Sequence, residues 1–357
     1  PQIMKDIPPA FIRFLLFPFT GLYGLAIEIW NLLYDKRCIK TSKFDIPVIS
    51  VGNLTVGGTG KTPFVIYLAQ HLKESSLSVG IVSRGYGRKT KGTVVVHDGK
   101  SILSSHDESG DEPWLIASAL KSVPVIVDED RTQGIQTLID KFPVDVVLLD
   151  DAFQHRRAGR DLDILLINSR EPSENYHLLP GGRLREPLRQ SRRASLIIHT
   201  KCPGHNIPAF ADRLAEFTAC PQISSVSVHQ LVQYRDGDFS LSEIPKDERV
   251  FAFCGVGDPA SFRQTLTDVG ISPVKFVAFP DHQAYSESVI KNLRSQMEAG
   301  RCKAIVTTEK DLVKLPPQFL ESFSIYIIKM TINLDETGKK ILTNLINQIM
   351  IKKESDL

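Results

Sequence analysis

A glycine-rich stretch between two apolar segments constrains this chain more than any other feature. It reads Thr55-Val56-Gly57-Gly58-Thr59-Gly60-Lys61-Thr62. A β-branched apolar run, residues 46–51, precedes it, and an apolar segment, residues 64–72, follows. That order predicts a strand, a loop and a helix, in which backbone N–H groups and the helix dipole bind phosphate. We expect Lys61 to reach the β- and γ-phosphates of a nucleotide and the Thr62 hydroxyl to hold Mg²⁺.

The stretch departs from the general phosphate-loop pattern at its first position. The pattern opens with glycine, and this chain has Thr55 there. Gly57 and Gly58 can supply the conformational freedom that a first glycine would give. The alternative interpretation is an ordinary glycine-rich turn before a helix, and the strand-to-helix context argues against it.

Composition limits the class of protein. A chain of 357 residues with 42% hydrophobic and 24% charged residues is typical of a globular protein of about two domains. The net charge of +2 argues against a general nucleic-acid-binding protein. The five cysteines are scattered without a C-x-x-C pair, which excludes a disulfide framework and a cysteine zinc site and fits a reducing compartment.

The order of apolar runs predicts an α/β fold. Seven short runs alternate with helical patterns in the first part of the chain, residues 48–51, 79–82, 94–97, 123–127, 144–149, 164–167 and 196–199. Several are almost wholly apolar, as in strands covered on both faces, so we expect a doubly wound, mostly parallel sheet. Four more follow, residues 250–253, 274–279, 304–307 and 324–328. A hairpin is expected within residues 233–247, and a closing amphipathic helix over 335–351.

The N-terminal segment differs from the rest. No charge occurs from Phe14 to Ile27, but Pro18, two glycines and Glu28 weaken the interpretation as a membrane-spanning helix. On a helical wheel, a narrow polar stripe opposes a broad apolar face; the stripe holds Arg13, Thr20, Glu28 and Asn31. Two interpretations remain open: a helix packed on the core, or a helix lying in a membrane interface. We therefore expect three parts: residues 1–40, 41–225 and 226–357.

Carboxylates stand at two informative places. Asp150 ends the apolar strand of residues 146–149 and is predicted to hold the Mg²⁺ shell beside the phosphate loop. Asp151 follows directly, and two adjacent carboxylates are costly without a nearby cation. Asp151 as a helix cap is the alternative. Asp111, before a helical segment, is either an N-cap or a general base that deprotonates an attacking hydroxyl.

Three further segments carry candidate groups. Residues 83–88, Ser-Arg-Gly-Tyr-Gly-Arg, follow the second strand, where doubly wound sheets bind ligands. Residues 179–187 are rich in glycine and proline and include Arg185, with further arginines at 189, 192 and 193, which suit an anionic ligand, an anionic membrane surface or merely a solvated face. His282 follows Asp281 after an apolar run, which makes this single histidine a candidate.

These blocks together resemble the tetraacyldisaccharide 4′-kinase family, which acts in lipid A biosynthesis. The matching segments are residues 52–63, 83–87, 110–113, 150–155, 160–163, 179–187, 280–282 and 308–311. The opening from Thr55 to Gly58 is the family's own form of the phosphate loop. Ala152 is a small departure, since the family pattern has glycine there.

The resemblance implies a P-loop NTPase-type kinase domain, a smaller α/β domain and an N-terminal membrane-interface helix. It implies transfer of the γ-phosphate of ATP, with Mg²⁺, to the 4′-hydroxyl of a tetraacylated glucosamine disaccharide 1-phosphate. Asp111 and His282 would deprotonate that hydroxyl as the domains close around ATP. Lys61, Asp151 and Arg185 would complete the catalytic group, and Thr62, Asp150 and Glu186 would hold the metal. A monomer bound peripherally to the cytoplasmic face of the inner membrane is expected.

Two other functions compete with this one. A membrane-associated phosphate-loop ATPase or GTPase switch would hydrolyse nucleotide to drive a partner. The guanine-binding pattern Asn/Thr-Lys-x-Asp is not met: residues 308–311 have the wrong offset, and residues 200–203 lack the aspartate. A non-catalytic nucleotide-binding partner is the third possibility. Joint retention of Lys61, Thr62, Asp111 and Asp150 argues against it.

Overall fold

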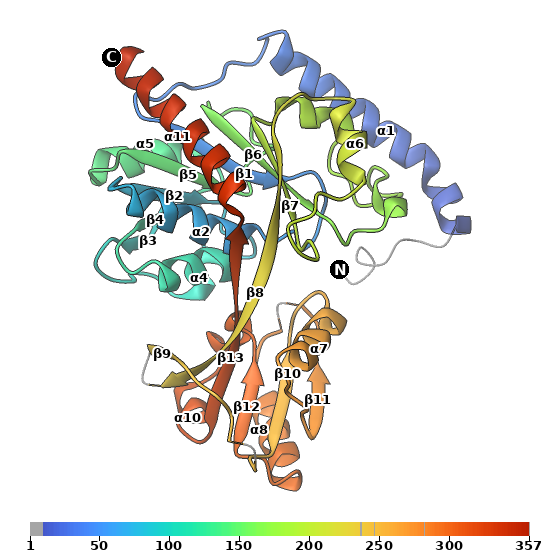
Figure 1. Ribbon diagram of the computed structural model, residues 1–357, viewed down its shortest axis with the longest axis vertical. Helices are drawn as coiled ribbons and strands as arrows, with labels where there is room; N and C mark the ends of the chain where they lie inside the picture. Colours follow the sequence, from blue (N-terminus) through green and yellow to red (C-terminus); the bar gives the residue numbers. More distant parts are fainter. Residues whose placement is uncertain (1–9, 236–237, 246, 282, 357) are drawn as a thin grey trace. The chain divides into compact units, whose positions relative to one another are not determined.

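The chain forms two compact units. The computed structural model describes residues 10–235, 238–245, 247–281 and 283–356 (Figure 1). Unit 1 comprises the chain up to residue 227 together with residues 332–357, and unit 2 comprises residues 228–331. Strands β8 (Gln222–Arg235) and β13 (Ser324–Leu334) carry the chain from one unit to the other.

Unit 1 is built on a mostly parallel sheet with the strand order β8-β7-β6-β1-β5-β2-β4-β3. Among the strand pairs described within this order, only β3 and β4 are antiparallel. The strands are β1 (Val48–Asn53), β2 (Val79–Ser83), β3 (Val94–Asp98), β4 (Pro124–Val127), β5 (Val146–Asp150), β6 (Leu162–Asn168) and β7 (Leu196–Thr200). The strand β1 lies between β5 and β6, so the carboxyl ends of β1 and β5 are neighbours. The predicted fold class is confirmed.

Helices cover both faces of this sheet because its strands are apolar on both sides. Within β5, Val146 and Leu148 join one core, and Val147 and Leu149 join another. The first core contains side chains of α2 (Lys61–Glu74), α4 (Asp111–Ala119) and α11 (Glu336–Asp356), and the second contains side chains of α5 (Arg131–Lys141). Shorter elements complete the unit: α3 (His106–Ser109), α6 (Phe210–Ala215), η2 (Ser173–Asn175) and η3 (Leu188–Arg193).

The closing helix corrects the predicted division of the chain. We expected it to close the C-terminal domain of residues 226–357 and left open whether it packs back on the first domain; α11 belongs to unit 1. Its side chains Leu342 and Ile346 are buried in the same core as Phe64 of α2. The chain therefore returns to the first unit at residue 332, after β13. The first expected boundary, after residue 225, lies two residues from the observed one.

Unit 2 is a smaller parallel sheet with helices. Its strands run in the order β11-β10-β12-β13, with β10 (Val250–Cys254), β11 (Lys275–Ala278) and β12 (Ala304–Thr307). Its helices are α7 (Pro259–Asp268), α8 (Glu287–Ala299), α9 (Glu309–Leu312) and α10 (Pro317–Leu320). The hairpin expected within residues 233–247 is present, because β9 (Asp238–Leu241) pairs antiparallel with β8. The length of β8 was not predicted.

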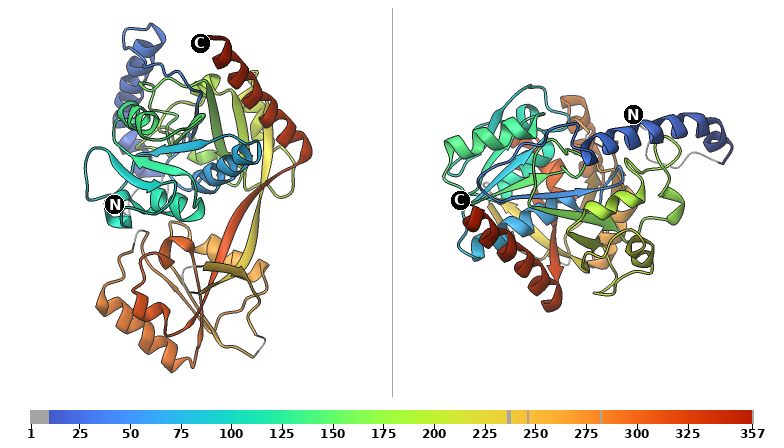
Figure 2. Two further views of the ribbon diagram at one scale, coloured as in Figure 1. Left: turned by 90° about the vertical axis from the view of Figure 1, so that its left-hand side faces the viewer. Right: turned by 90° about the horizontal axis from the view of Figure 1, so that it is seen from above.

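The N-terminal helix α1 (Ala10–Asp35) lies along the outside of unit 1 (Figures 1 and 2). Large apolar side chains on one side of this helix are exposed. Phe11 and Phe17 are each 73% exposed, whereas Asn31 is 2% exposed. The polar stripe therefore faces the protein, which overturns the interpretation as a helix packed by its apolar face. By length and composition, residues Leu15–Asp35 could cross a membrane.

Candidate active site

The phosphate loop lies between β1 and α2, as predicted. Gly60 is the N-cap residue of α2 in a left-handed conformation, with φ of 83°. Lys61 and Thr62 are the first two residues of the helix, so their backbone N–H groups have no acceptor within it. Thr62 is buried, with 5% of its surface exposed. A helix N-terminus with these free N–H groups is suited to the phosphates of a nucleotide.

The start of the loop explains why a first glycine is dispensable. Thr55 forms an antiparallel bridge with Leu184, and the Val56 N–H donates to the Arg183 oxygen at 2.8 Å. These residues are held extended, a conformation that any residue adopts. The bend comes at Gly57, where φ is 111° and a Cβ would lie 1.9 Å from Nη2 of Arg183.

This geometry predicts different results for the two central glycines. Gly57→Ala should lower the free energy of unfolding by about 1–3 kcal/mol and weaken ATP binding, because a φ of 111° is strained for alanine and the new methyl group would push the end of the Arg183 side chain aside. Gly58→Ala is the matched control, since a Cβ there has no atom within 4 Å. Thermal unfolding and ATP titration would measure both effects. Equal melting temperatures for the two variants would contradict the loop geometry.

Lys61, Asp151 and Arg185 form a charged group beside the loop. The Asp151 carboxylate lies 3.7 Å from the Lys61 Nζ, and Nη1 of Arg185 donates to both of its oxygens at 3.1 Å. Burial alone would raise the pKa of Asp151, but the charges of Lys61 and Arg185 lower it. The carboxylate is therefore ionised and holds both cations in place. The cap interpretation of Asp151 is not needed, because these cations compensate its charge.

Asp150 has the environment expected of a metal ligand. It is 1% exposed; its Oδ2 accepts from the Ser83 hydroxyl at 2.8 Å, and its Oδ1 is buried without a hydrogen-bond partner. Burial raises the pKa of Asp150, and the nearby charges of Glu112 and Asp151 raise it further. A bound cation would relieve this cost, so the residues fit Mg²⁺. Within the described part of the chain, no three acidic, histidine or cysteine side chains cluster as a complete metal site. Mg²⁺ bound with nucleotide takes its remaining ligands from phosphate and water.

The loop that follows Asp150 is hydrogen-bonded to the end of β1. The Gln154 amide donates to the Asn53 oxygen at 2.8 Å, and the Asn53 side chain accepts from Lys61 at 3.4 Å. Gly52 permits this contact, since a Cβ there would lie 2.7 Å from the Phe153 backbone nitrogen. Sequence reasoning assigned no role to Asn53, and Ser83 entered only as part of a loop. A polar residue at the end of a strand beside a phosphate loop is the signal that could have identified both.

Arg131 was also missed. It is 3% exposed at the start of α5, and burial lowers its pKa to about 10, against the opposing effect of Asp150 and Asp151. A buried guanidinium near two carboxylates adds positive charge for an anionic ligand. Its position after β4, on the same edge of the sheet as Asp150, is visible only once the strand order is known.

Asp111 is the first residue of α4, and the N-cap is Gly110 with φ of 90°. The capping interpretation of Asp111 is therefore wrong. A Cβ at Gly110 would lie 2.9 Å from the Tyr86 oxygen, so this segment touches the loop of residues 83–88. Two motifs that are distant in sequence meet here. The role of Asp111 as a general base stays a prediction.

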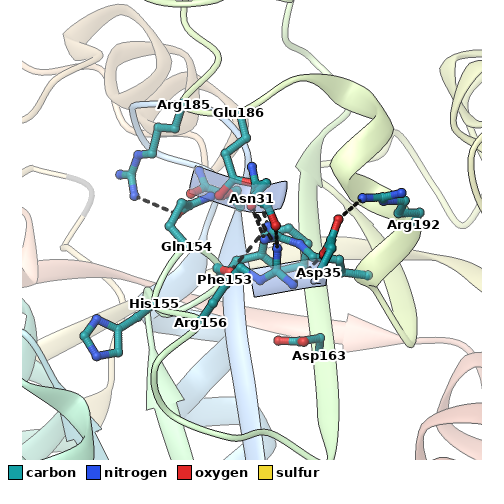
Figure 3. A network of polar contacts seen from close by, with 12 residues as sticks. Asn31, Asp35, Phe153, Gln154, His155, Arg156, Asp163, Arg185, Glu186 and Arg192 are labelled. Carbon is teal, nitrogen blue, oxygen red and sulfur yellow. Dashed lines mark hydrogen bonds and ion pairs between the residues drawn. The ribbon is translucent and has the colours of Figure 1, made fainter. Parts of the chain in front are cut away.

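Glu186 does not face an open metal position. Its carboxylate is buried, lies 2.6 Å from Nη2 of Arg193 and accepts a long hydrogen bond from Asn31 at 3.5 Å (Figure 3). Only 10% of the Arg193 side chain is exposed, so a solvated face does not describe it, while Arg192 is half-exposed and pairs with Asp35 at 2.5 Å. A carboxylate already paired with a guanidinium is a poor metal ligand, and the predicted metal role of Glu186 has no support in this geometry.

Two candidate segments, residues 280–282 and 308–311, belong to unit 2. His282 lies outside the described residues. Asp311 is fully buried and accepts from the Gly255 N–H at 3.0 Å, the Tyr285 hydroxyl at 2.8 Å and the Thr308 hydroxyl at 2.6 Å. This carboxylate joins three loop segments within unit 2, which is a structural role.

Comparison with known proteins agrees with the resemblance noted in the sequence. The family model described as Tetraacyldisaccharide-1-P 4′-kinase matches residues 12–349. The Tetraacyldisaccharide 4′-kinase of Aquifex aeolicus is 39% identical over 93% of this chain and 98% of its own length. That of Syntrophus aciditrophicus is 36% identical over 98% and 96%. The crystal structure of LpxK from Aquifex aeolicus in complex with ATP matches with a TM-score of 0.79 and 37% identity, covering 95% of this chain and 99% of that one. This chain belongs to the Tetraacyldisaccharide-1-P 4′-kinase family.

Proposed function

We propose that this chain transfers the γ-phosphate of ATP to the 4′-hydroxyl of a tetraacylated glucosamine disaccharide 1-phosphate in lipid A biosynthesis. The observation that carries the proposal is the group at the start of α2. Lys61 contacts Asp151 there, and Asp150 keeps a buried oxygen without a partner. The full-length match to the family supplies the substrate class.

The reaction needs a proton acceptor and a stabilised phosphoryl group. Asp111, with His282 as its partner, would take the proton from the 4′-hydroxyl. The hydroxyl oxygen then bonds to the γ-phosphorus as the bond to the β–γ bridging oxygen breaks, which leaves ADP. Lys61 and Arg185 would stabilise the negative charge on the transferring group. Thr62 and Asp150 would hold Mg²⁺, which neutralises charge on the phosphates when bound.

We further propose that the enzyme acts as a monomer attached to the cytoplasmic face of the inner membrane by α1. Large apolar side chains cover the exposed side of this helix, and its polar side is bound to unit 1. A helix held to the protein in this way would lie in the interface rather than leave the protein to span the bilayer. A lipid substrate could then reach the site without leaving the membrane.

Phosphate transfer from γ-labelled ATP tests the activity directly. The assay would contain Mg²⁺ and detergent micelles with a tetraacyl disaccharide 1-phosphate. We expect label on the lipid, and none when the acceptor is omitted. Label released only as free phosphate, whether or not lipid is present, would contradict the kinase function and favour a nucleotide switch.

The membrane role of α1 predicts that polar substitutions on its exposed side release the protein from vesicles. Phe17→Ser combined with Leu22→Ser should reduce the vesicle-bound fraction by at least about tenfold, because burial of each side chain contributes about 1.5–3 kcal/mol. Vesicle co-sedimentation would measure it. These positions are 73% and 66% exposed, so folding should be unaffected. Deleting residues 1–34 is a poorer test, since it also removes the buried Asn31 from its arginine partners. Unchanged binding of the double variant would contradict the interfacial role.

A further inference from the structure

The polar side of α1 is bound to the residues that carry the charged group of the site. The Tyr23 hydroxyl donates to the Arg185 backbone oxygen at 2.8 Å, and the Thr20 hydroxyl accepts from the Gly181 N–H at 3.1 Å. A helix that served only to attach the protein to a membrane would need no contact with Arg185. This contact therefore requires a separate explanation.

Arg185 is held on three sides. Its backbone N–H donates to the Leu54 oxygen at 2.7 Å, next to the phosphate loop, and its backbone oxygen accepts from Tyr23. Its guanidinium binds Asp151, which in turn contacts Lys61. Tyr23 on α1 is thus three contacts from the lysine of the phosphate loop, and each contact is within 3.7 Å.

A second attachment of α1, through Asn31, reaches the loop that follows Asp151 and the segment that contains Arg185 (Figure 3). The Asn31 side-chain oxygen accepts from Nη1 of Arg156 and from Nη1 of Arg193, each at 3.1 Å. Arg193 pairs with Glu186, the neighbour of Arg185, and its guanidinium stacks 4.4 Å from the centre of the Phe153 ring. Because Phe153 and Arg156 follow Asp151 in one short loop, α1 contacts both the backbone of Arg185 and a side chain of the loop that follows Asp151.

We propose that Tyr23 and Asn31 are positioning residues, which hold Arg185 and the loop of residues 151–156 so that Arg185 meets Asp151 beside Lys61. The helix that meets the membrane is then also part of the scaffold of the site. The inference rests on the proposed function of Arg185 and Asp151. It extends that function by assigning α1 a role in turnover that is separate from attachment to lipid.

Tyr23→Phe tests the inference, since it removes one hydroxyl and keeps the ring. We expect kcat to fall about three- to tenfold, the loss that one hydrogen bond accounts for, while the KM for ATP and vesicle binding stay unchanged. Tyr34→Phe is the matched control on the same helix. The Tyr34 ring packs against Arg156 at 5.0 Å, and its hydroxyl makes no hydrogen bond among the described residues, so kcat should be retained.

A double-mutant cycle with Arg185→Ala separates positioning from general stability. If Tyr23 acts through Arg185, Tyr23→Phe should have no further effect on kcat once the Arg185 side chain is gone. An equal loss of kcat in both backgrounds, or a loss explained by release from vesicles, would overturn the inference. The inference would also be overturned if Arg185→Ala alone lowered kcat but Tyr23→Phe alone left kcat unchanged. The proposed role of Arg185 would then stand. If Arg185→Ala itself had no effect on kcat, both the role and the inference would fall.

Discussion

Asp111→Asn is expected to lower kcat by about 10²–10⁴-fold, the range that a positioned general base contributes. Asparagine keeps the size of the side chain but cannot accept the proton of the 4′-hydroxyl. Because Asp111 is the first residue of α4, its carboxylate also interacts favourably with the helix dipole. That structural contribution is about 0.3–1 kcal/mol, too small to explain such a loss of turnover. ATP affinity should stay within about twofold, since the phosphate loop is unchanged.

Asp107→Asn is the matched control for this prediction. Asp107 lies on the neighbouring helix α3, is exposed and pairs with Lys89 at 2.6 Å. Exposed ion pairs contribute little to stability, so both kcat and the melting temperature should be retained. Single-turnover phosphate transfer and ATP titration would be measured for both variants. If Asp111→Asn lost ATP binding or unfolded at a much lower temperature, Asp111 would be a structural residue.

The features predicted from sequence are those that local pattern encodes. The phosphate loop was recognisable because a strand, three glycines, Lys61 and Thr62 stand in consecutive order. The strands of unit 1 were recognisable because burial on both faces leaves short runs such as residues 146–149 almost wholly apolar. Each of these signals lies within one short stretch of sequence, so it can be recognised before the strand order is known.

Features that depend on pairing between distant segments could not be predicted in the same way. The contact of Arg185 with Asp151 joins residues 34 positions apart, and that of Asn31 with Arg193 joins residues 162 apart. Helical periodicity gave the polar and apolar sides of α1 correctly, but it could not decide which side meets the protein. Which core α11 covers could not be decided for the same reason, since an amphipathic pattern does not specify the core against which a helix packs.

Lys61→Ala is expected to lower kcat by about 10²–10³-fold, the loss seen when one preorganised charge is removed from a developing anion. Folding should be preserved, because Asp151 keeps its bidentate contact with Arg185. Lys73→Ala is the matched control: Lys73 lies at the opposite end of α2 and is exposed. Its loss should leave kcat unchanged. Full activity of Lys61→Ala would contradict the assignment of the phosphate loop.

The same variant predicts a change in pH dependence that a purely structural lysine would not cause. Burial raises the pKa of Asp150, and the Lys61 charge opposes that rise. Asp150 must be ionised to bind Mg²⁺, so activity falls as the pH drops through its pKa. Removing Lys61 raises that pKa further, and the acidic limb of the kcat/KM profile should therefore move to higher pH. Measured against Lys73→Ala at one fixed, subsaturating Mg²⁺ concentration, an unmoved limb would mean that Lys61 and Asp150 do not act in one electrostatic unit.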